Sequence, residues 1–62
     1  MLGGGNMRHF LYRDRETCED YIIDANSKEE IKETIETYCL GNPRFICELD
    51  DFEYEMSGLD VY

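Results

Sequence analysis

A segment with both ends marked, residues 27–40, constrains the fold of this 62-residue chain more than any other feature. Ser27 and Glu30 have the S-x-x-E spacing of a capping box, in which each side chain accepts a hydrogen bond from the other residue's backbone amide. At the far end, Gly41 permits a left-handed exit and Pro43 prevents continuation. The segment is therefore predicted to form a helix.

The predicted helix has two distinct sides. Four apolar residues recur at i, i+4, i+7 and i+8, which is the spacing of one buried stripe: Ile31, Ile35, Tyr38 and Cys39. Lysines flank this stripe, and the opposite, solvent-facing side is purely acidic, formed by Glu29, Glu33 and Glu36. The rest of the chain is expected to pack under the apolar stripe.

Composition indicates a small folded domain with an acidic surface. The hydrophobic fraction of 42% and eight aromatic residues support a core, although a chain this short buries little surface and gains from a second copy, a partner or a metal. The formal net charge of -9 repels nucleic acid and phospholipid surfaces and favours a partner with a basic face. Direct nucleic-acid and membrane binding are therefore not expected.

Cysteine usage and the first residues indicate the compartment. The three cysteines, Cys18, Cys39 and Cys47, form no close pair, which is typical of free thiols in a reducing compartment. Residues 1–6 lack the apolar core of a secretory signal, and no run approaches transmembrane length. We expect a cytoplasmic protein with a flexible tail over 1–6 and one domain over 7–62.

Three short segments have the composition of strands. Residues 8–13, 20–24 and 44–49 are rich in aromatic and β-branched side chains, and residues 14–19 connect the first two as a hairpin loop. Phe10 and Tyr12 share one predicted face, with His9 and Leu11 on the other. The side chains expected to face inward from the later strands are Tyr21, Ile23, Ala25, Phe45, Cys47 and Leu49.

Residues 51–57 fit two kinds of element. The alternation of Phe52, Tyr54 and Met56 with acidic residues predicts a fourth strand, which is the favoured interpretation. The spacing of Asp50 and Glu53 also matches a capping box, so a short helix from Asp51 to Ser57, ending at Gly58, remains the alternative. Residues 59–62 either extend this element or lie free.

These elements predict an α+β domain in which one amphipathic helix packs across a small antiparallel sheet. The order is β-β-α-β-β, with a short helix as the alternative for the last element. No repeat or second domain is visible in the sequence.

Catalytic and metal chemistry have little support in the sequence. His9 is the only histidine, and no nucleophile elbow or glycine loop accompanies Cys18 or Cys47. Three cysteines and a histidine match a zinc ligand count but not the close pairing of zinc ligands. We therefore expect no enzyme activity, no metal and no cofactor. Cys39 and Cys47 are interpreted as small apolar core residues, Cys18 as an exposed loop thiol, and His9 as a residue at the sheet surface.

The acidic residues are concentrated toward the C-terminus. From Phe45 onward there are six acidic residues and no basic one. On a strand, Asp51, Glu53 and Glu55 would repeat every ~6.7 Å, about half as densely as the charges on one DNA strand, so mimicry of DNA needs a second row. Glu48 and Asp50 are candidates for that second row. The acidic side of the predicted helix, with Glu29, Glu33 and Glu36, offers a separate row.

In this character the chain resembles the small acidic inhibitors that bacteriophages direct against host nucleic-acid enzymes: uracil-DNA glycosylase inhibitors, antirestriction proteins and anti-CRISPR proteins. The resemblance covers the size, the single-domain build and the carboxylate-aromatic run from Glu48 to Met56. It implies binding in the basic channel of a nuclease or glycosylase in place of DNA or RNA, with Phe52 and Tyr54 as apolar anchors, in the cytoplasm of the host cell.

The resulting hypothesis is a non-enzymatic inhibitor of a basic nucleic-acid-binding protein. The alternative is a homodimeric structural or regulatory adaptor that pairs through an exposed sheet edge, with the charge serving solubility. The residues expected to contact the partner are Glu48, Asp50, Asp51, Phe52, Glu53, Tyr54 and Glu55, with Glu29, Glu33 and Glu36 on the helix.

Overall fold

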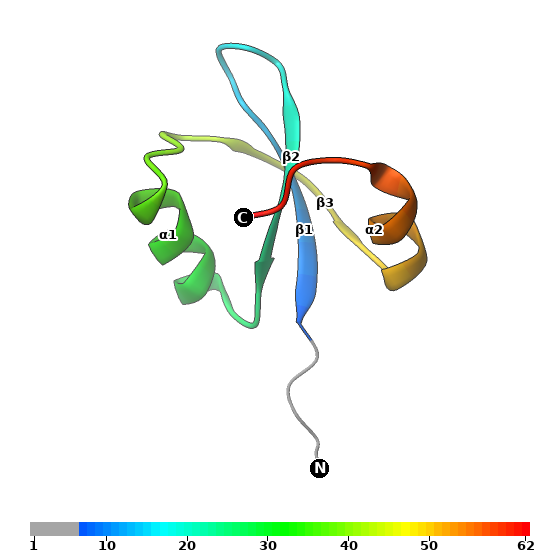
Figure 1. Ribbon diagram of the computed structural model, residues 1–62. Coiled ribbons are helices and arrows are strands. Elements are labelled where there is room, and N and C mark those ends of the chain that lie inside the picture. Colours follow the sequence, from blue (N-terminus) through cyan, green and yellow to red (C-terminus); the bar gives the residue numbers. More distant parts are fainter. Residues whose placement is uncertain (1–6) are drawn as a thin grey trace.

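The computed structural model of the chain describes residues 7–62 and confirms a small α+β domain (Figure 1). The predicted tail, residues 1–6, lies outside the described residues. The elements in chain order are β1 (Arg8–Arg13), β2 (Asp20–Ala25), α1 (Lys28–Thr37), β3 (Arg44–Leu49) and α2 (Asp51–Ser57).

The three strands form one antiparallel sheet in the order β2-β1-β3. β1 and β2 form the predicted hairpin, with Arg8 opposite Ala25 and Arg13 opposite Asp20. Their connecting loop is closed by the backbone N–H of Asp14, which donates to the carbonyl of Glu19 over 2.8 Å. α1 then carries the chain back so that β3 pairs with the free side of β1, and this places β1 at the centre of the sheet.

The main core lies between α1 and one face of the sheet. Phe10 of β1 and alternate residues of β2 are buried there against Ile31 of α1. The predicted inward direction of Tyr21, Ile23 and Ala25 is therefore confirmed. Ile23 is fully buried, and burial also raises the pKa of the Tyr21 phenol. Tyr12, Ile35 and Leu40 border this cluster.

Both ends of α1 differ in detail from the prediction. The hydroxyl of Ser27 accepts from the Glu30 amide over 3.3 Å, as expected, but the Glu30 carboxylate accepts from the amide of Asn26 and not of Ser27. The helix ends at Thr37. Gly41 is left-handed (φ 79°), as predicted, but Cys39 (φ 54°) adopts the left-handed conformation two residues earlier. The amides of Cys39 and Leu40 donate to the carbonyls of Glu36 and Ile35, as in a Schellman motif. Tyr38 and Cys39 are therefore exposed beyond the helix end, and their predicted place in the buried stripe is wrong.

β3 has the predicted bounds but not the predicted inward face. The register between β1 and β3 shifts after Leu11, so that Cys47 lies opposite Leu11 whereas Phe45 lies opposite Tyr12. The bulge places Phe45 and Cys47 on opposite faces of the sheet. α1 packs over β2 and does not cover β3, so Phe45 is 53% exposed and Cys47 is exposed too.

The favoured strand over residues 51–57 is wrong, and the helical alternative is correct. Asp50 and Glu53 form a complete capping box: the Asp50 carboxylate accepts from the Glu53 amide over 2.7 Å, and the Glu53 carboxylate accepts from the Asp50 amide over 3.2 Å. Gly58 ends the helix in the left-handed region (φ 67°). The capping contacts are local in sequence, which explains why they prevail over a short alternating pattern.

The last residues follow neither predicted course. Val61 forms a parallel bridge with Ile22, and the Ile22 amide donates to the carbonyl of Asp60 over 2.8 Å. Figure 1 shows this segment crossing from α2 to the far side of β2. Residues 60–62 therefore cover the outer edge of β2. Within residues 7–62, neither helix has the length and apolar character needed to cross a membrane.

Candidate interaction surfaces

α2 packs on the face of the sheet opposite α1, next to β3, and it covers His9 of β1. The ring of Tyr54 stacks on the imidazole of His9, with centroids 3.8 Å apart and planes 9° from parallel. The His9 side chain also contacts β2, since its Nδ1 lies 2.6 Å from Oδ1 of Asp24. His9 is only 9% exposed, so its predicted place at the sheet surface is wrong, because α2 covers it.

The two ring nitrogens of His9 have acidic surroundings. Its Nδ1 faces Asp24, and its Nε2 lies 3.4 Å from Oδ1 of Asp51. Both ring nitrogens therefore face carboxylates, and neither is presented to a thiol that could act as a nucleophile. Among residues 7–62 there is no group of three or more histidine, cysteine, aspartate or glutamate side chains that could hold a metal ion. The histidine is best understood as the polar link between α2 and the sheet.

Three of the predicted partner-binding carboxylates make hydrogen bonds within the chain, in addition to the contact of Asp51 with His9. Arg8 donates to Glu48 through two hydrogen bonds of 3.0 and 2.7 Å, and this guanidinium lowers the pKa of the Glu48 carboxyl. Asp50 and Glu53 are used in the capping box of α2. These three residues stabilise local structure, and a partner could engage them only in competition with those contacts.

Among the remaining predicted residues of this region, Tyr54 is half-buried against His9, so its predicted role as an exposed anchor is not available, whereas the others form an exposed surface on α2. Phe52 is 71% exposed and Met56, one turn further on, is 70% exposed. Asp51 and Glu55 are exposed beside them with the same one-turn spacing, about 6 Å along the axis. Sequence reasoning did not assign Met56 to the site, although its i, i+4 spacing from Phe52 would have indicated it on a helix. We call this surface the α2 ridge, formed by Asp51, Phe52, Glu55 and Met56.

The acidic stripe of α1 is a separate surface. Glu29, Glu33 and Glu36 are exposed, as predicted. α1 and α2 lie on opposite faces of the sheet, which Figure 1 shows with β1 between them. The two sets of carboxylates therefore do not join into one continuous row. The strand geometry assumed for Asp51, Glu53 and Glu55 does not exist either, so the ~6.7 Å spacing no longer applies.

An apolar groove lies on the α1 side of the sheet, between α1 and β3. It is lined by Phe10 and Tyr12 of β1, Lys28 and Ile31 of α1, and Phe45 of β3. The rings of Phe10 and Tyr12 lie 6.4 and 5.6 Å from that of Phe45. The groove exists because α1 covers β2 and leaves the side chains of β3 without a cover.

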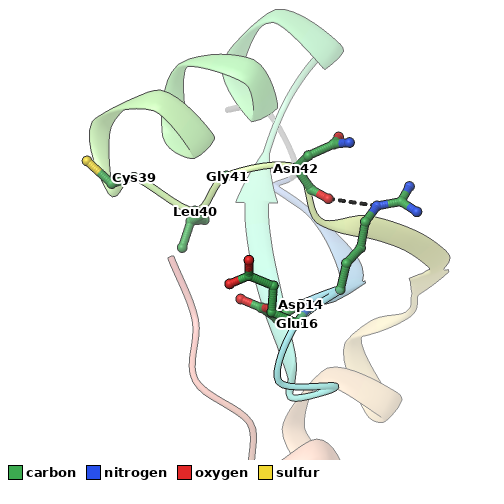
Figure 2. A pocket seen from close by; sticks show the side chains of 7 residues that line it. Asp14, Glu16, Cys39, Leu40, Gly41 and Asn42 are labelled. Carbon is green, nitrogen blue, oxygen red and sulfur yellow. Dashed lines mark hydrogen bonds between the residues drawn. The ribbon is translucent and has the colours of Figure 1, made fainter.

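A cavity of about 340 Å³ separates the β1–β2 loop from the segment that follows α1. Figure 2 shows the carboxylates of Asp14 and Glu16 on the loop side, and Leu40 and Asn42 on the other side. Arg15 joins the two sides, because its Nε donates to the backbone oxygen of Asn42 over 2.8 Å. Asp14 accepts from the amides of Glu16 and Thr17, which lowers its pKa. This carboxylate therefore stabilises its own turn.

The three cysteines are all free and exposed. This confirms the exposed position predicted for Cys18, whereas the core positions predicted for Cys39 and Cys47 are wrong. Cys39 lies beyond the end of α1, and Cys47 lies on a strand that α1 does not cover. Comparison with models of protein families, with curated proteins and with solved structures found no match to the chain.

Proposed function

We propose that this chain is a non-enzymatic inhibitor that binds the basic nucleic-acid-binding surface of a nuclease or another defence enzyme. The observation that carries the proposal is the α2 ridge, where two large apolar side chains stand exposed beside carboxylates with no basic residue on the helix. Exposed apolar groups of this size are typical of binding surfaces, and they supply affinity once buried. The surrounding negative charge attracts a basic partner over long range.

The helical form of α2 changes how such an inhibitor would act. A seven-residue helix with carboxylates one turn apart does not reproduce a long row of phosphates. It presents instead a compact wedge, with apolar anchors at its centre and charge around them. We therefore propose that the ridge inserts into a basic channel and excludes the nucleic acid by occupying it. The net charge of -9 favours the approach.

The test is inhibition of purified nucleic-acid enzymes with basic channels, including CRISPR nucleases, restriction nucleases and uracil-DNA glycosylase. We expect one of these to be inhibited, with the complex weakened by salt and displaced by competing duplex DNA. A bacterial lysate passed over the immobilised protein widens the panel, and each protein that salt releases is then assayed in the same way.

Matched variants distinguish binding through the α2 ridge from a general effect of the negative charge. The double variant D51N/E55Q removes two charges from the ridge and spares Asp50 and Glu53, which cap the helix, and F52A/M56A removes the anchors. Both should weaken inhibition at least about tenfold. The control E29Q/E33Q removes two charges from α1 on the opposite face and should change inhibition little. Equal losses in all three variants, or none in the ridge variants, would rule out the ridge as the binding surface.

A further inference from the structure

The apolar groove between α1 and β3 extends beyond the part described above. That first hollow has a volume of about 420 Å³, and a second hollow of about 480 Å³ continues it along α1. Tyr12 and Phe45 line both hollows, and Ile35 and Pro43 line the second. Phe45 is 53% exposed at this place. The groove therefore offers two adjoining apolar hollows on the α1 face of the sheet.

Both lysines of the chain line this groove, one at each hollow. Lys28 lines the first hollow and Lys32 lines the second. They are one helical turn apart on α1, which is about 6 Å along the axis. Within residues 7–62 the ion pairs involve arginines and His9, and neither lysine takes part in one. Glu36 also lines the second hollow, one turn beyond Lys32. The groove thus places two positive charges beside apolar side chains.

The α2 ridge has the complementary pattern. Phe52 and Met56 form an apolar row with side chains one turn apart, and Asp51 and Glu55 form an acidic row beside it with the same spacing. The side chain of Asp51 is 96% exposed, although its Oδ1 lies 3.4 Å from Nε2 of His9. Amphipathic helices bind apolar grooves by placing anchors with this spacing into successive pockets. The ridge therefore matches the groove in its apolar row and in its charged row.

One copy of the chain cannot insert its ridge into its own groove. The groove lies on the α1 face of the sheet, and α2 lies on the other face, as Figure 1 shows. A contact between ridge and groove therefore joins two copies, and each of them still has one surface of the pair unused. Such a contact is heterologous and continues from copy to copy, head to tail.

We propose that the groove between α1 and β3 binds the α2 ridge of a second copy of this chain. The two apolar anchors of one copy enter the two hollows of the other, beside Phe45, and the two carboxylates of the ridge meet Lys28 and Lys32. Burial of the anchors and of Phe45 supplies affinity, and the ion pairs fix the register. The contact is weak and reversible, because it is small and each copy carries a net charge of -9.

This inference does not rest on the proposed inhibitory function, although both use the α2 ridge. A ridge bound in the groove of another copy cannot occupy an enzyme channel at the same time. The double variant K28E/K32E changes the groove and leaves the ridge intact, so it should lose self-association and keep its inhibition of the target enzyme. If no enzyme is inhibited, the inhibitory function fails, and the self-association is still tested by itself.

The first experiment uses two variants that each keep one of the surfaces. F52A/M56A keeps the groove, and K28E/K32E keeps the ridge. In sedimentation equilibrium up to about 1 mM, the average mass of the wild-type protein should rise with concentration, whereas each variant alone should remain a monomer. An equal mixture of the two variants should form a heterodimer and nothing larger, because one intact ridge meets one intact groove. A monomeric wild-type protein, or a mixture that stays monomeric whatever else the groove binds, would overturn the proposal.

The second experiment locates the contact by nuclear magnetic resonance. When K28E/K32E is labelled, unlabelled F52A/M56A should shift the amide signals of α2, and with the labels exchanged the signals of Ile31 and Phe45 should shift. The variant with all four substitutions lacks both surfaces and should leave both spectra unchanged. Shifts that avoid α2 and the groove, or equal shifts with the fourfold variant, would contradict the contact.

A further pair of variants keeps the test independent of the lysines. Phe45→Ala removes the ring that lines both hollows, and Ile46→Ala, exposed on the same strand but outside the groove, is its control. Circular dichroism shows whether each variant is folded. Phe45→Ala should remain a monomer, whereas Ile46→Ala should associate like the wild-type protein. Association of folded Phe45→Ala at the wild-type strength would place the contact elsewhere.

Discussion

The two faces of the sheet are covered by two helices that are held in different ways. α1 is held by burial of apolar side chains, with Ile31 packed against Phe10 and Ile23. α2 is held by directional contacts, in which Tyr54 stacks on His9 and His9 contacts Asp24 below it. Apolar burial is additive over area, whereas a polar stack depends on a few groups in one arrangement. The comparison predicts that the α1 face determines the stability of the domain and that α2 can open separately.

The largest expected effect is from loss of volume in the α1 face. Ile23→Ala removes three carbons from a fully buried site and should lower the free energy of unfolding by about 2–5 kcal/mol. In a domain of this size such a loss approaches the whole stability. Denaturant unfolding followed by circular dichroism measures it. If the variant lost less than a Phe52→Ala control on the exposed ridge, the α1 face would not be the dominant core.

Removing the polar link should affect α2 more than the rest. His9→Ala deletes the stack with Tyr54 and leaves Asp24 without its partner, which should cost about 1–3 kcal/mol. Amide hydrogen exchange should show lost protection within α2 while Ile23 and its neighbours remain protected. Tyr54→Phe keeps the ring and serves as the control. Unchanged exchange in α2 would mean that other contacts hold this helix.

The two helix caps provide a matched pair of substitutions. Ser27→Ala and Asp50→Ala each remove one N-cap acceptor, worth about 0.5–2 kcal/mol. Ser27→Ala should lower the global stability, because α1 covers the core, whereas Asp50→Ala should mainly increase fraying of α2. Denaturant unfolding and hydrogen exchange of both variants distinguish these outcomes. Equal loss of global stability would show that the two helices unfold as one unit.

The smallest effect concerns ion pairs, which occur on both faces. Arg8 lowers the pKa of Glu48, and Arg13 lowers the pKa of Asp20 on the other face. Carboxyl groups with depressed folded pKa values stabilise the fold above their unfolded pKa, about 4, and this contribution is lost as the pH falls through the folded pKa. Carboxyl titration by nuclear magnetic resonance should show each pKa returning to its ordinary range in Arg8→Ala and Arg13→Ala, respectively. A Glu48 pKa unmoved by Arg8→Ala would contradict the pairing.

Much of the fold was predictable because its signals are local. The bounds of β1 and β3, the N-cap at Ser27 and the inward face of β2 follow from alternation and capping within a few residues. The choice between strand and helix for residues 51–57 also rested on a local signal. Two local signals competed there, the alternation of apolar residues and the Asp50–Glu53 capping box, and the capping box indicated the correct structure.

The candidate site was less predictable. The acidic positions were visible in the sequence, but their availability depends on partners far away in the chain. Glu48 meets Arg8 across the sheet, and His9 is covered by a helix that begins more than forty residues later. Met56 lies beside Phe52 on the α2 ridge only because residues 51–57 form a helix. The exposure of Phe45 and Cys47 depends on the bulge and on how far α1 reaches.

The sequence by itself therefore determined the elements, since hydrophobic period, caps and turn residues act over one or two turns of chain. The tertiary structure decided which strand lies at the open edge, which face each helix covers and where the last residues pair. These outcomes depend on contacts between distant segments that compete for the same surface. Within residues 7–62, the segment 60–62 closes the edge at β2 and leaves the outer side of β3 unpaired.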